Sequence, residues 1–262
     1  MALAAMIIIE AASTQALRGN DYMRRILAIL WLAAGVAGAG TAAAAPLKVV
    51  IWGGTGMIGQ RIVQEALSRG ASVTVVVRDP NKHAPAANPK LTVVQGDILD
   101  VAQDAQLLAG ANAAVCAVSF RGAGANPGDY RKAAEILAGA LHGLGGKAPH
   151  LIFVGGAGSL ESKPGVLLAD GMPDGSPFKA EVLGQKAALD YFRTRNDVPW
   201  TYFSPAGSIA PGTRTGKFRL GGDRLVTDAQ GKSSISAEDY AVAALDELEK
   251  PAHIHQRFTI GY

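Results

Sequence analysis

A glycine-rich loop between a short apolar run and an amphipathic stretch constrains the fold of this chain more than any other segment. The loop reads Gly53-Gly54-Thr55-Gly56-Met57-Ile58-Gly59. Before it, residues 48–52 are apolar after the initial lysine, which predicts a buried β-strand. After it, apolar residues recur at helical spacing from Ile58 to Leu67, which predicts a helix with one buried face. This order of strand, glycine turn and helix is typical of the first unit of a parallel α/β sheet.

The glycines of this loop each have a physical role in such a unit. Gly53 permits the tight turn, Gly56 lets the backbone approach a diphosphate, and Gly59 lets the helix and the strand pack closely. The free amides at the start of the helix then face the phosphates of a dinucleotide. We therefore expect a pyridine dinucleotide to be bound by Gly53, Thr55, Gly56, Met57, Ile58 and Gly59. A purely structural turn is the alternative.

After Pro46 the chain alternates short apolar runs with longer helical ones. This alternation predicts a Rossmann fold, a single doubly wound parallel α/β sheet covered by helices on both faces. Further strands are expected at 72–77, 92–94, 113–118, 151–154, 201–203 and 257–261, and helices at 57–69, 129–142, 178–195 and 237–249. Residues 217–220 and 225–227 flank Gly221-Gly222-Asp223 and predict a hairpin, part of a small carboxy-terminal cap over the cofactor site.

Composition and charge restrict the other classes of function. The chain has 262 residues, of which 48% are hydrophobic, so residues 46–262 suffice for one packed domain. Its formal net charge of +3 arises without a basic run, which argues against a nucleic-acid partner. A single cysteine, Cys116, excludes an internal disulfide, and five scattered histidines give no metal-ligand spacing. We therefore expect a small-molecule partner and no metal.

Residues 1–45 differ from the rest of the chain. From Met23 the order is Arg24-Arg25, an apolar stretch to Ala37 and small residues up to Ala45, which is typical of a secretory signal peptide. We expect cleavage after Ala44, and export to the periplasm if this segment functions, otherwise a cytoplasmic location. The alternatives are an uncleaved membrane anchor, which gives the only expected contact with a membrane, and an extension that the natural protein lacks.

The end of the second expected strand bears on which dinucleotide binds. Enzymes selective for NAD usually place a carboxylate there for the ribose 2′-hydroxyl, whereas this chain has Arg78. A guanidinium pairs with the 2′-phosphate of NADP(H), so we expect NADP(H), with NAD(H) as the alternative. Asp79 reverses this preference if it faces the ribose in place of Arg78, and an ordinary surface arginine is the third interpretation.

Three further residues are candidate cofactor contacts. Asp97 follows the third strand, where its carboxylate can accept a hydrogen bond from the adenine amino group while Ile98 packs on the ring. A local helix cap is an equal alternative for Asp97. Ser119, just past the fourth strand, is placed to line the nicotinamide ribose.

With these motifs the chain resembles the atypical short-chain dehydrogenase/reductases, in the NmrA-like and flavin-reductase or biliverdin-reductase-B-like branch. The glycine loop carries the resemblance together with segments 153–161, 200–205, 214–223 and 235–241. The resemblance implies a Rossmann fold and, in several relatives, NADPH-dependent reduction of flavins, quinones or related electrophiles. It also places Thr55 and Arg78 at NADP-contacting positions.

One element of many short-chain dehydrogenases is missing, the Tyr-x-x-x-Lys pair that donates a proton. Val182 stands four residues before Lys186, so chemistry that needs a strong general acid is not expected. Ser159 is a candidate for binding the acceptor, and the alternative is an ordinary loop serine. Lys186 is a candidate for reaching the cofactor ribose, and the alternative is a solvated helix lysine. The leading hypothesis is an NADP(H)-dependent oxidoreductase that transfers hydride to a small electrophile such as a quinone or flavin. A non-catalytic NADP(H)-binding sensor and a sugar-nucleotide epimerase or dehydratase stay open.

Overall fold

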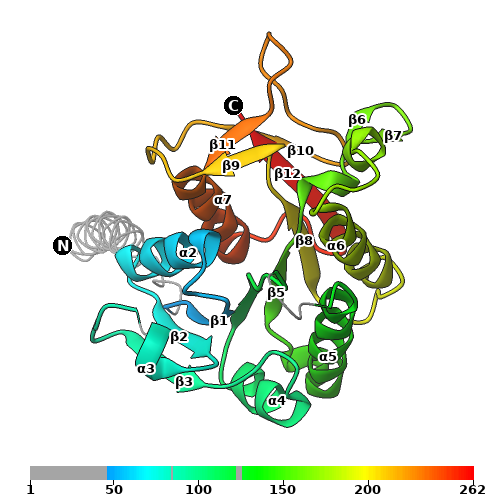
Figure 1. Ribbon diagram of the computed structural model, residues 1–262. Helices are drawn as coiled ribbons and strands as arrows, with labels where there is room; N and C mark the ends of the chain where they lie inside the picture. The colour runs from blue at the N-terminus through cyan, green and yellow to red at the C-terminus, as the bar shows by residue number, and fades with distance from the viewer. Residues whose placement is uncertain (1–45, 84, 122–125) are drawn as a thin grey trace, which may run out of the picture. The chain divides into compact units, whose positions relative to one another are not determined.

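The central sheet begins with the strand that precedes the glycine loop. The computed structural model describes residues 46–83, 85–121 and 126–262. The eight strands lie in the order β10-β12-β8-β5-β4-β1-β2-β3 (Figure 1). Seven of them are β1 (Lys48–Trp52), β2 (Ser72–Val77), β3 (Leu91–Gln95), β4 (Ala113–Cys116), β5 (His150–Val154), β8 (Trp200–Ser204) and β12 (Gln256–Gly261), all parallel; β10 (Arg219–Gly221) runs antiparallel to β12.

Helices cover both faces of this sheet (Figure 1). One face carries α2 (Met57–Ser68) and α7 (Ala237–Glu249), and the other carries α4 (Val101–Ala109), α5 (Gly128–Leu144) and α6 (Lys179–Phe192). Because successive side chains of a strand point to opposite faces, β1 supplies Val49 and Ile51 to one core and Val50 and Trp52 to the other. The expected doubly wound α/β sheet is therefore confirmed.

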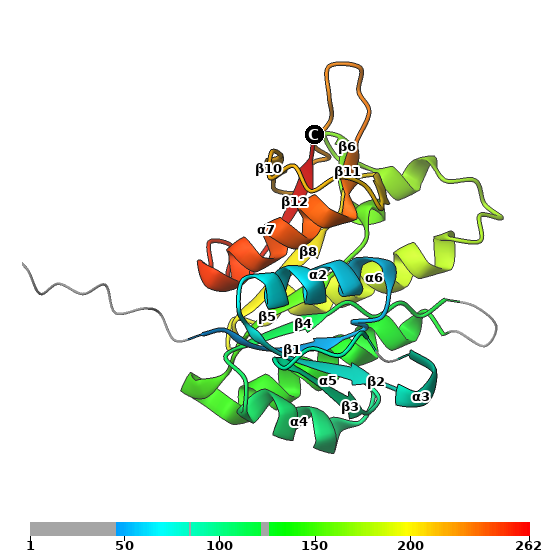
Figure 2. The same ribbon diagram turned by 90° about the vertical axis from the view of Figure 1, so that its left-hand side faces the viewer.

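The smaller elements lie around this framework. They are α3 (Pro80–His83), the 3-10 turns η1 (Gly145–Lys147), η2 (Ala157–Ser159) and η3 (Leu168–Gly171), and two small sheets, β6 (Glu161–Lys163) with β7 (Val166–Leu167) and β9 (Ser208–Ala210) with β11 (Ser234–Ser236). In Figure 2 the arrowheads of β1 and β2, which mark the carboxyl ends of these strands, point to the side of the molecule where the segment leading into α6 lies. Pro46–Tyr262 forms one compact unit, and the predicted leader lies outside the described residues.

The expected hairpin around Gly221-Gly222-Asp223 is wrong. Residues 219–221 pair with β12 across its outer edge, and residues 225–227 form no strand. The physical reason is a different partner, because the Glu161 amide donates to the Asp223 carbonyl and the Leu225 amide donates to the Glu161 carbonyl. This part of the cap is consequently tied to the segment after β5.

Candidate functional site

A cleft of about 820 Å³ opens at the carboxyl ends of the parallel strands. Its walls come from the start of α2, the residues after β4, β5 and β8, η3 with the segment after it, and the first turns of α6. Most lining residues are glycine or apolar. Those with polar or charged side chains are Ser119, Arg121, Glu181, Gln185 and Ser208. The segments that follow β4 and β5 thus both contribute to the cleft.

The turn at the start of α2 has the geometry expected for an anion-binding site. Gly53 has a φ of +75°, and a Cβ there would lie 2.4 Å from the Ala117 carbonyl oxygen. A Cβ on Gly59 would lie 2.1 Å from the carbonyl oxygen of Gly53, so helix and turn are packed as closely as backbone allows. Gly56 precedes the helix without a side-chain cap, and the first turn holds no acidic residue. The Gly56 amide donates to the Gly53 carbonyl at 3.0 Å, but Met57 and Ile58 also line the cleft, and their amides can hold a diphosphate there.

Arg78 and Asp79 differ in their availability to a ribose. Arg78 is exposed after β2, and within the described part of the chain its guanidinium has no acidic partner. The Asp79 carboxylate accepts a hydrogen bond from the Asn81 amide at 3.1 Å and pairs with the Lys82 ammonium at 3.0 Å. Asp79 is therefore held in its own turn at the start of α3, which favours Arg78 as the residue that meets the ribose.

The remaining cofactor candidates have mixed surroundings. Ser119 is exposed and lines the cleft. The Asp97 carboxylate accepts from the Leu99 amide at 3.0 Å, in the turn that precedes α4. Ile98 is only 5% exposed and packs in the core beneath α4 and α5. The adenine contacts of Asp97 and Ile98 stay predictions.

Ser159 and Lys186, the two candidates for catalysis, do not line the cleft. Ser159 is buried, and both its hydroxyl and its carbonyl accept hydrogen bonds at 3.0 Å from the guanidinium of Arg257. The Lys186 ammonium lies 2.6 Å from the Asp190 carboxylate one turn further along α6. Their roles stay predictions, but the geometry gives each of them a structural partner.

The cleft contains a charged pair that sequence reasoning missed. Glu181 is 7% exposed, and its Oε2 accepts a hydrogen bond from Nε of Arg121 at 2.6 Å. Its Oε1 accepts from the Tyr130 hydroxyl at 2.9 Å and from Nε2 of Gln185 at 3.3 Å. The hydrogen bond with Glu181 raises the pKa of Arg121, and burial raises the pKa of Tyr130. Sixty residues separate Arg121 from Glu181, so no local motif signals the pair.

Comparison with known proteins identifies the family of this chain. A family model described as NAD(P)H-binding matches residues 53–251, which is most of the chain. The chain belongs to this NAD(P)H-binding family. The expected fold, the family resemblance and the pyridine-dinucleotide cofactor are thereby confirmed.

Three solved structures are similar to this NAD(P)H-binding chain. One, named as an exported protein, is from Burkholderia pseudomallei, with 40% identity, coverage of 82% of this chain and 100% of the other, and a TM-score of 0.71. A second, named as an epimerase, is from Bacteroides thetaiotaomicron, with 34% identity, 83% and 98% coverage, and a TM-score of 0.72. A third, named as an NADH-flavin reductase, is from Streptococcus pneumoniae, with 32% identity, 82% and 99% coverage, and a TM-score of 0.71.

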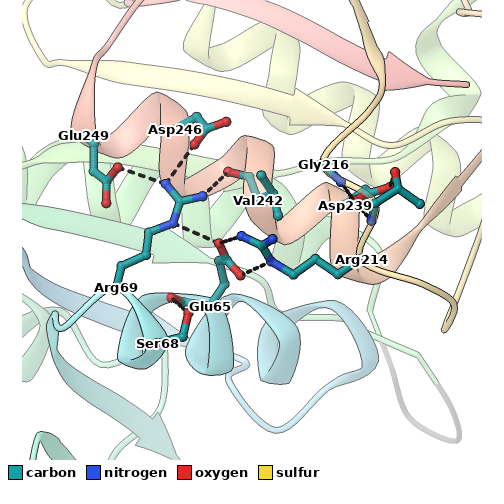
Figure 3. A network of polar contacts seen from close by, with 10 residues as sticks. Glu65, Ser68, Arg69, Arg214, Gly216, Asp239, Val242, Asp246 and Glu249 are labelled. Atoms are coloured by element: carbon teal, nitrogen blue, oxygen red, sulfur yellow. Dashed lines mark hydrogen bonds and ion pairs between the residues drawn. The ribbon is translucent and has the colours of Figure 1, made fainter.

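A network of ion pairs and hydrogen bonds joins α2, α7 and the segment after β9 in this NAD(P)H-binding chain (Figure 3). The buried Glu65 carboxylate on α2 accepts two hydrogen bonds from Arg214 at 2.8 Å and one from Arg69 at 2.9 Å. The bonds from Arg214 contribute most to lowering the pKa of Glu65 below its usual range. Asp239 on α7 accepts from the backbone amides of Thr215 and Gly216 at 2.8 Å. The segment that follows β9 is therefore tied to both helices, and it leads from cleft residues 207–209.

The described residues contain neither a group of metal ligands nor a helix that could span a membrane. No three His, Cys, Asp or Glu side chains in residues 46–83, 85–121 and 126–262 are grouped so that they could hold a metal ion. Within the same ranges, no helix has the length and apolar character needed to cross a bilayer.

Proposed function

We propose that this NAD(P)H-binding chain is a reductase that transfers hydride from NADPH to a small electrophile such as a quinone or a flavin. The observation that carries the proposal is the cleft itself. It begins at the uncapped start of α2 and continues to apolar residues of the segment between η3 and α6, including Met172 and Phe178. Its volume of about 820 Å³ lies within the ordinary range of small-molecule sites, so acceptor and nicotinamide can meet in one space.

The residues of the chain supply binding, orientation and exclusion of water. Bound NADPH supplies the hydride. Backbone amides of Met57 and Ile58 hold the diphosphate, Gly56 lets it approach the backbone, and Ser119 lines the cleft just after β4. The apolar wall excludes water, and positioning of this kind accounts for much of the rate in hydride transfer. No tyrosine, histidine, lysine or cysteine is among the described residues that line the cleft, which supports an acceptor that takes its proton from water.

We further propose that NADPH is preferred over NADH. The exposed Arg78 is free to pair with a 2′-phosphate, while Asp79 is held by Asn81 and Lys82. A charge-assisted hydrogen bond of about 1.5–3 kcal/mol corresponds to a preference of about 10- to 150-fold.

Two other functions remain as alternatives. The same lack of a proton donor in the described cleft lining favours a non-catalytic NADP(H)-binding sensor. The Bacteroides relative, named as an epimerase, supports the epimerase or dehydratase alternative.

We also propose export through the segment from Met23 to Ala44, supported by the Burkholderia protein named as exported. Sequencing the amino terminus of the protein from its source tests this, and finding Met1 or Ala2 there contradicts it.

The test of the proposed function is NADPH oxidation, followed at the nicotinamide absorbance band, with a panel of quinones, flavins and dyes. We expect oxidation well above the protein-free rate with at least one acceptor, faster with NADPH than with NADH. Tight NADPH binding without oxidation by any acceptor supports the sensor and contradicts the reductase.

A further inference from the structure

We infer that the preferred acceptor carries an anionic group, and that Arg121 binds this group in the cleft. The inference rests on the proposed reductase function, and it names the class of acceptor. Its starting point is the distribution of charge in the cleft. Among the described lining residues, Arg121 and Glu181 alone have charged side chains.

Glu181 is occupied by the protein itself. Its carboxylate is buried and accepts hydrogen bonds from the Tyr130 hydroxyl, from Gln185 and from Arg121. A carboxylate with three donors and little exposure is a poor partner for an incoming ligand. Its charge acts instead on Arg121, whose guanidinium it orients.

Arg121 is held by one edge only. The bond to Glu181 uses Nε at 2.6 Å, and within the described residues neither Nη1 nor Nη2 has a hydrogen-bond partner. The side chain is 64% exposed and lines the cleft. Two parallel N–H donors in a fixed plane match the geometry of carboxylate, sulfonate or phosphate oxygens. The pair therefore resembles a preorganised anion receptor, with Glu181 as the positioning residue.

The neighbouring contacts fix the position of this receptor. The amide of Phe120, the residue before Arg121, donates to the Tyr130 hydroxyl at 3.1 Å. Tyr130 is fully buried, and its ring packs edge-on against Phe120. The backbone that carries Arg121 is thus anchored to α5, while its guanidinium is anchored to α6. An ion pair that only joins these elements needs no free donors, whereas an anion site does.

The test compares two flavins that share one ring system and differ by a phosphate, FMN and riboflavin. Each is titrated into the full-length protein saturated with NADP⁺, so that no turnover occurs, and binding is followed by flavin fluorescence. We expect FMN to bind about 10- to 100-fold more tightly than riboflavin. A naphthoquinone with and without a carboxylate side chain, followed by calorimetry, gives a second matched pair.

Variants separate recognition from general charge. Arg121→Gln is expected to abolish the preference while riboflavin binding changes less than about threefold, and Arg121→Lys to keep part of it. Glu181→Gln is expected to reduce it, because the guanidinium loses its orientation. Arg131→Gln is the control, because this substitution removes the same charge at a different place. Arg131 lies on α5 outside the cleft lining and pairs with Glu135.

Equal affinity, or no binding, for both members of both pairs overturns the inference. It is also overturned if Arg121→Gln weakens NADP⁺ binding and leaves the flavin preference intact, because Arg121 then serves the cofactor. Failure of the proposed reductase function gives a different result from failure of the anion site. An Arg121-dependent preference without NADPH oxidation by any acceptor keeps the anion site and removes the reductase, whereas oxidation without any preference removes the anion site alone.

Discussion

Replacing Gly59 by alanine tests the close contact between the glycine turn and α2. The added Cβ would lie 2.1 Å from the carbonyl oxygen of Gly53, whereas an ordinary carbon–oxygen contact is about 3.3 Å. Turn and helix must therefore separate by about 1 Å, and overpacking of this kind costs about 1–3 kcal/mol. The shift falls on the amides proposed to hold the diphosphate. We expect lower stability together with NADPH binding weakened at least about 10-fold, equivalent to about 1.4 kcal/mol.

Gly139 provides the matched control. It lies within α5, as Gly59 lies within α2, but nothing is within 4 Å of a Cβ added there. Gly139→Ala is expected to stabilise the fold by about 0.5–1 kcal/mol through helix propensity and to leave NADPH binding unchanged. The two variants should thus differ by about 1.5–4 kcal/mol in the free energy of unfolding, measured by urea denaturation, with NADPH affinity measured by calorimetry. Equal stability and equal affinity of the two variants would show that the contact between Gly59 and the Gly53 carbonyl does not matter.

Three further predictions concern charged groups. Arg78→Ala should weaken NADPH binding about 10- to 150-fold and leave NADH binding nearly unchanged; an equal loss for both in calorimetry contradicts the assignment. Asp104 is buried against the Trp52 indole, and burial raises its pKa to about 7. The folded state therefore binds the Asp104 proton more tightly than the unfolded state, so the free energy of unfolding falls as pH rises from about 4 to 7. Thermal melts should show that Asp104→Asn stabilises the protein more at pH 8 than at pH 5. The same gain at both pH values contradicts a raised pKa of Asp104. Arg214→Ala removes two of three donors to buried Glu65 and should cost about 1–2 kcal/mol in urea denaturation, and an unchanged midpoint argues against the network.

Local patterns were sufficient to predict the main elements of the fold. The expected strands at 48–52 and 72–77 and the helix at 237–249 have the observed bounds, because each has strong periodicity and clear end signals. The fourth strand was expected to extend to residue 118 but ends at Cys116. On one side its neighbour β1 ends at Trp52, where Gly53 turns away with positive φ, so the ladder between β1 and β4 stops at Cys116. A strand end set by its neighbour's turn is not visible in the strand itself.

Long-range polar contacts limited what could be predicted about the site. The glycine turn was identified because its residues are consecutive and flanked by strand and helix. The contact of Ser159 with Arg257 spans 98 residues, and that of Arg121 with Glu181 spans 60. Such pairs form only when the sheet brings distant loops to one edge. The nine-residue helix α4 was also missed, since it is shorter than the window of about 11–18 residues over which a helical period can be recognised.

Calorimetric titration of the full-length protein with NADPH, NADH and their oxidised forms measures dinucleotide binding itself. We expect saturable binding, with NADPH about 10- to 150-fold tighter than NADH. No measurable heat or binding with any of the four nucleotides, on folded protein, would contradict the claim that the start of α2 holds a dinucleotide.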